Sequence, residues 1–243
     1  MPLALLEHIS LNILDRESAY AFYVTGLGGR VNDPTTNGRQ LHVNLGASQF
    51  HLLLQTNGVE GPSPVSAAQV WAGHIELWSR EPLHQLFSRL QKIGSDPSVS
   101  EPPSGVTVLS VTCPYGNQFF IRQAPQGFDP QLHGAHPSGS GTLIALTRAV
   151  HLVRPGAAAR LRDFWSSLLG ATCEFAEHGD DPPTAHCVVR FGSGQQLIFD
   201  ERVDAPAAHA YECDEANAYH ICVCRAVCPD IEHIRPANPV SRV

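Results

Sequence analysis

Four residues that can bind a metal ion or an anion recur along the chain at nearly equal spacing. His8, His74, Arg148 and His220 stand in similar local sequences, and they are 66, 74 and 72 residues apart. The imidazole of histidine is a common metal ligand and exchanges protons near neutral pH, whereas the guanidinium of arginine binds anions. Regular spacing of this kind predicts an internal repeat.

The residues around His8 indicate which elements would position such a side chain. Polar and apolar residues alternate from position 7 to 14, so one face of the segment is polar and carries the histidine. This period of two is typical of a half-buried β-strand. Asp15 is a suitable N-cap for a helix, and glycines at the end of the segment allow a turn. The helix is predicted to bury a stripe formed by Ala19, Phe22, Tyr23 and Leu27.

The same order of elements returns along the chain. The first unit covers residues 6–55 and the second 73–123, each with a strand, a helix and three further strands. A third unit covers 143–200, and a fourth, beginning near 218, supplies its first strand alone. The sequence therefore predicts a repeated β-α-β-β-β unit whose fourth copy is incomplete.

The domain organisation follows from these units and from composition. Residues 124–141 are rich in glycine, proline and serine and predict a linker. A first domain would then cover 1–123 and a second, incomplete one 142–228, followed by a tail at 229–243. Because one unit cannot cover its own concave face, we expect unit one to pair with unit two. Unit three would be left open, completed by another chain in a homodimer, or part of a shortened, inactive form.

Composition limits the possible partners. The chain has 243 residues, is 43% hydrophobic and 16% charged, and carries a net charge of −7 without a basic run. This charge argues against nucleic acid and an anionic membrane surface as partners. The N-terminus enters the first strand without a signal-like segment, and no apolar run approaches the roughly 18 residues of a membrane span. We therefore expect a cytoplasmic protein that acts on a small molecule.

The cysteines predict reduced thiols rather than disulfides. Their number is odd, seven, and six of them follow residue 170, mostly within strand-like segments. A zinc site can also be written from Cys222, Cys224, Cys228 and His233. The CxC spacing on a strand disfavours it, because such a strand lacks the turn of a zinc knuckle.

Strand alternation groups further polar residues with the recurring ones. Ser10 and Asn12 share a face with His8, and Gln49 shares a face with His51. In the second unit Glu76 and Trp78 share a face with His74, and Arg122 shares one with Phe120. We expect these faces to line a concave surface.

Three motifs resemble those of the vicinal oxygen chelate superfamily, which includes glyoxalase I, extradiol dioxygenases and the bleomycin-resistance proteins. They are the first-strand histidine, a helix ending in FY-x-x-x-LG at 22–28 (FW in the copy at 164–170), and the segment CPYGNQFFI at 113–121, which is similar to the family's DPxGNxxEL. The resemblance covers nearly the whole chain. It implies an α+β fold in which tandem βαβββ units pair into a curved, cup-shaped mixed sheet with helices outside.

The resemblance also implies a metal centre inside the cup. Family members hold a divalent ion with one residue from the first and one from the fourth strand of each paired unit. Those positions correspond here to His8, His51 and His74, with Phe120 in place of a fourth ligand. Such a site would hold Fe, Zn, Ni or Mn and polarise vicinal oxygens, with Glu76 as the candidate base. The set departs from the family pattern because it contains no carboxylate.

Two classes of function remain open from the sequence. The first is a metal-dependent enzyme, either a lyase of the lactoylglutathione-lyase kind or a dioxygenase, that acts on a small molecule with adjacent oxygens. The second is a metal-free binding protein of the bleomycin-resistance type. Its cup would hold an apolar or aromatic ligand and would be lined by Asn12, Asn44, Trp78, Phe120 and Arg122.

Overall fold

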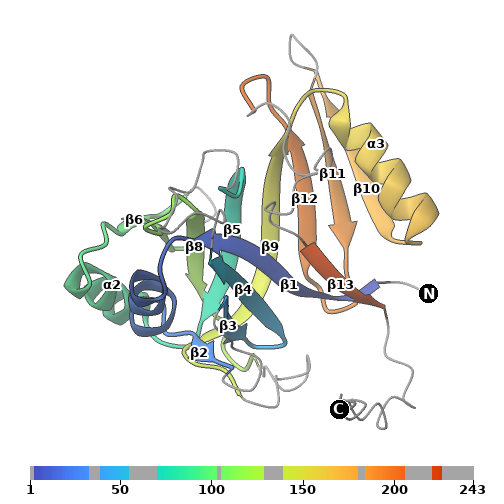
Figure 1. The fold of residues 1–243 in the computed structure, drawn as a ribbon. Helices are drawn as coiled ribbons and strands as arrows, with labels where there is room; N and C mark the ends of the chain where they lie inside the picture. Colours follow the sequence, from blue (N-terminus) through green and yellow to red (C-terminus); the bar gives the residue numbers. More distant parts are fainter. Residues whose placement is uncertain are drawn as a thin grey trace, which may run out of the picture.

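The α+β class expected from the sequence is confirmed by a computed structural model of the chain. The structure describes residues 3–32, 39–54, 70–102, 105–128, 139–179, 184–205 and 221–225. Curved mixed sheets form the body of the molecule and the helices lie outside them (Figure 1). No helix among these residues has the length and apolar character needed to cross a membrane.

The first unit has the predicted order of elements. It comprises β1 (Leu3–Ile13), α1 (Arg16–Ala19), the π-helix η1 (Tyr20–Gly26), β2 (Arg30–Val31), β3 (Gln40–Leu45) and β4 (Ser48–Leu54). The carboxylate of Asp15 accepts a hydrogen bond from the backbone N–H of Ser18 at 2.7 Å and so caps α1. The four residues of the predicted helical stripe are all buried.

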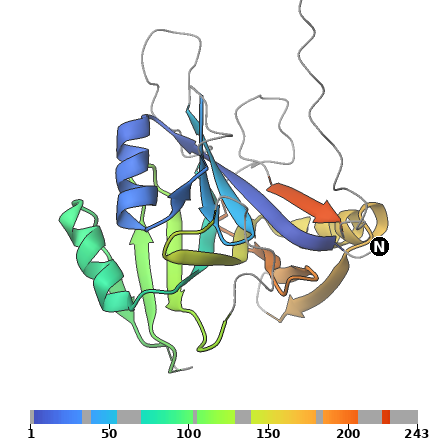
Figure 2. The same ribbon diagram turned by 90° about the horizontal axis from the view of Figure 1, so that it is seen from below.

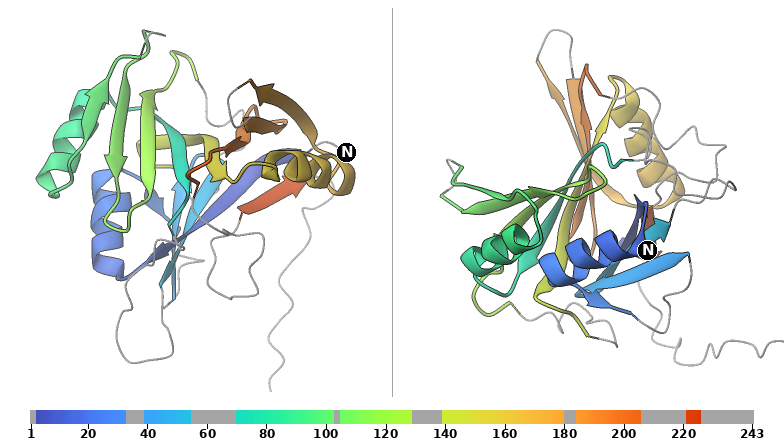
Figure 3. Two further views of the ribbon diagram at one scale, coloured as in Figure 1. Left: turned by 90° about the horizontal axis from the view of Figure 1, so that it is seen from above. Right: turned by 60° about the vertical axis from the view of Figure 1, so that its left-hand side comes forward.

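The second and third units repeat this order. Unit two consists of β5 (Gly73–Ser79), α2 (Leu83–Lys92), β6 (Ser98–Ser100), β7 (Val108–Thr112) and β8 (Gln118–Gln123). Unit three consists of β9 (Leu143–Val153), α3 (Ala157–Asp163), the π-helix η4 (Phe164–Leu168), β10 (Thr172–His178), β11 (Thr184–Arg190) and β12 (Gln196–Glu201). The fourth unit is represented by β13 (Ile221–Arg225). The helices of units one and two lie side by side (Figure 3).

The pairing of the units differs from the one expected. Among the described residues one sheet has the order β10-β11-β12-β9-β5-β8-β7-β6, which joins unit two to unit three. The other has the order β13-β1-β4-β3-β2, so unit one is paired with β13 (Figure 2). Among the described residues unit one therefore shares its sheet with the single strand β13, whereas unit three shares a sheet with unit two. The first strands of the units have similar patterns, so each can pair with the first strand of any other unit. The sequence pattern therefore does not specify which two units pair.

The strand register confirms that the sequence alignment matched equivalent positions. In units one, two and three the first strand runs parallel to the fourth, and the recurring residue lies opposite a glutamine. These pairs are His8 with Gln49, His74 with Gln118, and Arg148 with Gln196. Residues opposite one another share a face of the sheet, so each pair projects to the same side.

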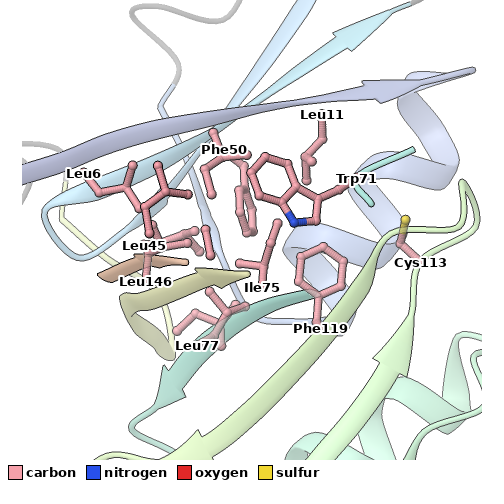
Figure 4. Packing of buried hydrophobic residues seen from close by; sticks show 14 of the residues in the cluster. Leu6, Leu11, Leu45, Phe50, Trp71, Ile75, Leu77, Cys113, Phe119 and Leu146 are labelled. Atoms are coloured by element: carbon pink, nitrogen blue, oxygen red, sulfur yellow. The ribbon is translucent and has the colours of Figure 1, made fainter. Parts of the chain in front are cut away.

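The hydrophobic core lies between the two sheets. The ring of Phe50 on β4 packs against that of Phe119 on β8, with ring centroids 5.7 Å apart. Leu11 from one sheet and Ile75 from the other point into the same layer (Figure 4). Because side chains alternate along a strand, the polar residues next to these apolar ones face away from the core on opposite sides.

A buried glutamine connects unit three to unit one at two β-bulges. The register shifts at Glu7 in β1 and at Thr147 in β9, directly after Leu6 and Leu146. The side chain of Gln195 accepts a hydrogen bond from the Leu6 N–H at 2.9 Å and donates to the Leu146 carbonyl at 2.9 Å. One amide thus satisfies backbone groups beside both bulges and fixes the two sheets relative to each other.

We expect Phe50→Ala and Phe119→Ala each to lower the free energy of unfolding by about 3–5 kcal/mol, because each leaves a large cavity in the shared core. The rings touch, so the double variant should lose less than the sum of the two single losses. Urea unfolding measures all three variants. Val99→Ala, at a side chain that is 50% exposed, is the control and should change stability by less than about 0.5 kcal/mol. Additive losses would show that the sheets do not meet at these rings.

Candidate functional sites

The structure divides the predicted site residues between the two sheets. His8, His51, Asn12 and Asn44 lie on the polar face of the sheet formed by unit one. The residues from unit two lie on the polar face of the other sheet, across the core, and are His74, Glu76, Trp78, Phe120 and Arg122. The structure therefore brings two of the three predicted metal ligands together and places His74 elsewhere. The separation follows from the pairing of unit two with unit three.

The polar face of unit one carries three stacked imidazoles, and we call it the histidine face (His8, His42 and His51). The ring centroids of His8 and His51 are 3.6 Å apart, and those of His42 and His51 are 3.9 Å apart. Glu7 contacts His8 Nδ1 because the bulge at Glu7 turns its carboxylate to the same side. Ligand atoms of Glu7, His8 and His51 all lie within 4.8 Å of one another, and His74 is not part of this group.

Amides hold the histidine face in position. His51 Nε2 lies 3.0 Å from Gln49 Oε1, and because an amide oxygen only accepts hydrogen bonds, we place a proton on Nε2. Gln49 Nε2 donates to Asn44 Oδ1 at 2.7 Å, and Asn44 donates to the Gly139 carbonyl at 3.0 Å. Burial and the nearby His8 lower the pKa of His42, although Glu7 acts in the opposite direction. Asn44 is thus part of the support for His51.

A cavity of about 340 Å³ lies on the polar face of the other sheet, and we call it the arginine cavity. Glu76, Trp78 and Arg122, which the sequence grouped together, all line it. Arg148 lines it as well, because β9 pairs with β5 and sets Arg148 opposite Glu76. Phe120 is not among the residues that line this cavity, and its ring stacks on His74, with ring centroids 4.3 Å apart.

Three basic side chains surround the buried carboxylate of Glu76, which is 8% exposed. Arg122 Nη1 forms an ion pair with it, Arg148 Nη1 lies 3.6 Å away and His74 Nε2 lies 3.5 Å away. Burial would raise the pKa of Glu76, but the interaction with His74 and the charges of both arginines outweigh it. The pKa therefore lies below its ordinary value. A lowered pKa makes Glu76 a weak base and suits it to holding the two arginines in place.

Sequence reasoning missed several residues of these sites. Strand alternation puts Glu7 on the face opposite His8, and a bulge leaves no signal in a single sequence. Phe128, which follows β8, lines the arginine cavity, as does Gln196, which accepts a hydrogen bond from Arg148 Nε at 2.8 Å. Arg148 is predicted from the sequence, because it aligns with His8 in the repeat and its guanidinium can bind an anion. Of the alternative zinc site, Cys222 and Cys224 lie on β13, and Cys228 and His233 lie outside the described residues.

Comparison with solved structures agrees with the architecture. Glyoxalase I from Zea mays superimposes with a TM-score of 0.55 at 13% identity, over 85% of this chain and 69% of that one. A candidate dioxygenase from Bacillus subtilis superimposes with a TM-score of 0.54 at 13% identity, over 92% of this chain and 67% of that one. No protein-family model matches the sequence, and no curated protein sequence matches it.

These similarities, together with the βαβββ units and their register, identify the fold. The chain has the fold of the vicinal oxygen chelate superfamily, to which glyoxalases and related dioxygenases belong. The fold alone does not name a reaction, because one fold carries many chemistries.

We expect Glu76→Gln to lower the free energy of unfolding at neutral pH by about 2 kcal/mol, because two arginines lose their buried counter-charge. Since folding lowers the pKa of Glu76, its contribution is complete above the ordinary carboxyl pKa and is lost as the pH falls through the lowered value. The stability gap between wild type and variant should therefore close in acid, as followed by urea unfolding at several pH values. Glu174→Gln, in an exposed ion pair with Arg190, is the matched control. A gap that stays constant with pH would contradict the ion-pair assignment.

Proposed function

We propose that the chain is a metal-dependent enzyme of the glyoxalase and dioxygenase type, acting on a small molecule with adjacent oxygens. The observation that supports this function is the grouping of Glu7, His8 and His51 on the histidine face. The proposal revises the ligand set expected from sequence, with Glu7 taking the part assigned to His74.

The donor types fit a divalent transition metal. Two imidazoles and one carboxylate with open positions are the set used by many non-haem iron sites, and zinc, nickel and manganese accept the same donors. Glu7 supplies the negative charge that the three-histidine set lacked. Donors bonded at about 2.0–2.2 Å lie at most roughly 4.4 Å apart, close to the 4.8 Å within which the ligand atoms of this group lie. The stacked rings of His8 and His51 must turn to bind.

The surrounding residues would orient the ligands. Gln49 accepts the Nε2 proton of His51 and so directs Nδ1 as the binding nitrogen. Burial and the neighbouring His8 lower the pKa of His42, which favours the neutral ring and would limit charge repulsion beside a bound cation. The metal itself would polarise the adjacent oxygens of the substrate as a Lewis acid.

A second candidate function is the binding of a small molecule without metal. The arginine cavity supports it, since none of the three histidines of the histidine face is among the residues that line this cavity. An enzyme of the first kind would need its substrate at the histidine face. Binding in the arginine cavity would need no metal.

Zinc titration by calorimetry and elemental analysis test the metal proposal. His51→Ala and Glu7→Gln should each weaken metal binding by more than about 100-fold, because loss of even a residue that only orients a ligand costs 10–100-fold. His84→Ala, an exposed histidine on α2, is the control and should bind as wild type does.

His74→Ala separates the revised ligand set from the one expected from sequence. It should keep wild-type metal affinity, because His74 lies on the other sheet. Loss of metal in His74→Ala, or unchanged binding in His51→Ala, would contradict the proposal.

A further inference from the structure

The arginine cavity has one cationic wall. Arg122 and Arg148 face one carboxylate, that of Glu76, so the wall carries an excess positive charge whatever the state of His74. Among the described lining residues Glu76 is the acidic one. The wall therefore favours a ligand with negative charge.

Arg148 is placed to reach such a ligand. Its side chain is 43% exposed, whereas that of Arg122 is 29% exposed and that of Glu76 is 8% exposed. Gln196 holds the Nε of Arg148, and the Nη1 atom lies 3.6 Å from Glu76, too far for a strong hydrogen bond. The guanidinium is thus held at its Nε, and Arg148 is one of the residues that line the cavity. A guanidinium binds a carboxylate with two parallel hydrogen bonds.

Another part of the cavity is apolar, and Ser48, Thr147, Ser193 and Gln195 also line the cavity. Trp78 and Phe128 meet edge to face with ring centroids 4.8 Å apart, and both line it. Aliphatic side chains from β1, β3 and β9 complete this part, namely Leu5, Leu45, Ile144 and Leu146. A ligand that fills the cavity must therefore present a charged end to the arginines and a flat or apolar body to Trp78.

We propose that the arginine cavity binds a small aromatic carboxylate, with the carboxylate on Arg148 and Arg122 and the ring against Trp78. A single negative charge matches the single excess positive charge of the wall. This inference rests on the second candidate function and names its ligand class. It is independent of the metal centre, because the histidine face lies across the core.

Tryptophan fluorescence reports binding directly. Trp71 and Trp165 are buried in the core, whereas Trp78 lines the cavity, so a ligand there should change the Trp78 emission. The probes are benzoate, phenyl phosphate as the second anion, and benzamide as the neutral molecule of the same shape. Benzoate should bind saturably with a Kd of about 1 mM or lower, and benzamide should bind at least about tenfold more weakly. Trp78→Phe should abolish the fluorescence change. Benzoate binding to this variant is then followed by calorimetry.

Variants identify the residues that bind the charge. Arg148→Gln should weaken benzoate binding by about tenfold and leave benzamide binding unchanged, because the lost hydrogen bonds involve charge. Arg202→Gln removes an exposed arginine that pairs with Asp200 outside the cavity, and it should bind benzoate as wild type does. Because Arg148 is the more exposed of the two arginines, its replacement should leave the fold intact, which circular dichroism checks.

The outcomes separate this inference from the metal proposal. His51→Ala should keep benzoate binding, and Arg148→Gln should keep zinc binding. Equal affinity for benzoate and benzamide, tighter binding of phenyl phosphate than of benzoate, or an unchanged affinity in Arg148→Gln would each overturn the assignment. Absence of a saturable benzoate response in wild type would overturn it as well, whatever the result of the zinc titration.

Discussion

The antiparallel ladder between β5 and β9 determines where the functional groups of this protein lie. It joins units two and three into one curved sheet and sets Arg148 opposite Glu76. Both of these residues line the arginine cavity. The ladder also occupies the edge of β5 that unit one would have needed. Unit one pairs with β13 instead, and its histidines project from a second face on the far side of the core. The two candidate sites are separate because this ladder forms.

The side chain of Gln195 joins the two sheets through several hydrogen bonds. Gln195 satisfies backbone groups of Leu6 and Leu146, and its Nε2 also lies 2.8 Å from the hydroxyl of Ser48 at the start of β4. A buried amide with so many partners tolerates little movement, because each lost hydrogen bond would leave a polar group buried and unpaired. It therefore holds the bulge that turns Glu7 toward His8, and with it the histidine face. The same side chain therefore stabilises the contact between the sheets and the position of Glu7 beside His8.

The sequence predicted the units well because each is specified locally. Asp15 caps its helix, the apolar stripe behind it is buried, and three of the four aligned residues, His8, His74 and Arg148, each lie opposite a glutamine in the same register. The fourth, His220, lies outside the described residues. These features depend on periods of two and 3.6 and on the chemistry of turns, which a single sequence carries. Unit boundaries and the α+β class follow from them.

The pairing of the units and the neighbours of the site residues depend on contacts between units. A repeated sequence pattern does not specify these contacts. First strands of similar pattern can pair in more than one combination, so the expected pairing of units one and two was as compatible with the sequence as the observed one. The position of His74 relative to His8 depends on that choice. Glu7 could not be predicted as a neighbour of His8, because the bulge that turns it is stabilised by Gln195, far along the chain. Phe128 reaches the arginine cavity from beyond the last strand of its unit.

Disulfide cross-linking tests the unit pairing most directly. His74 lies opposite Val150 in the β5–β9 ladder, and residues so placed have Cα atoms about 4.5–5.5 Å apart, within reach of a disulfide. Had unit one paired with unit two, the partner of His74 would have been Ser10. Peptide mapping after mild oxidation should find a bond in His74→Cys with Val150→Cys and none in His74→Cys with Ser10→Cys. A bond in the second pair and none in the first would contradict the account given for both sites.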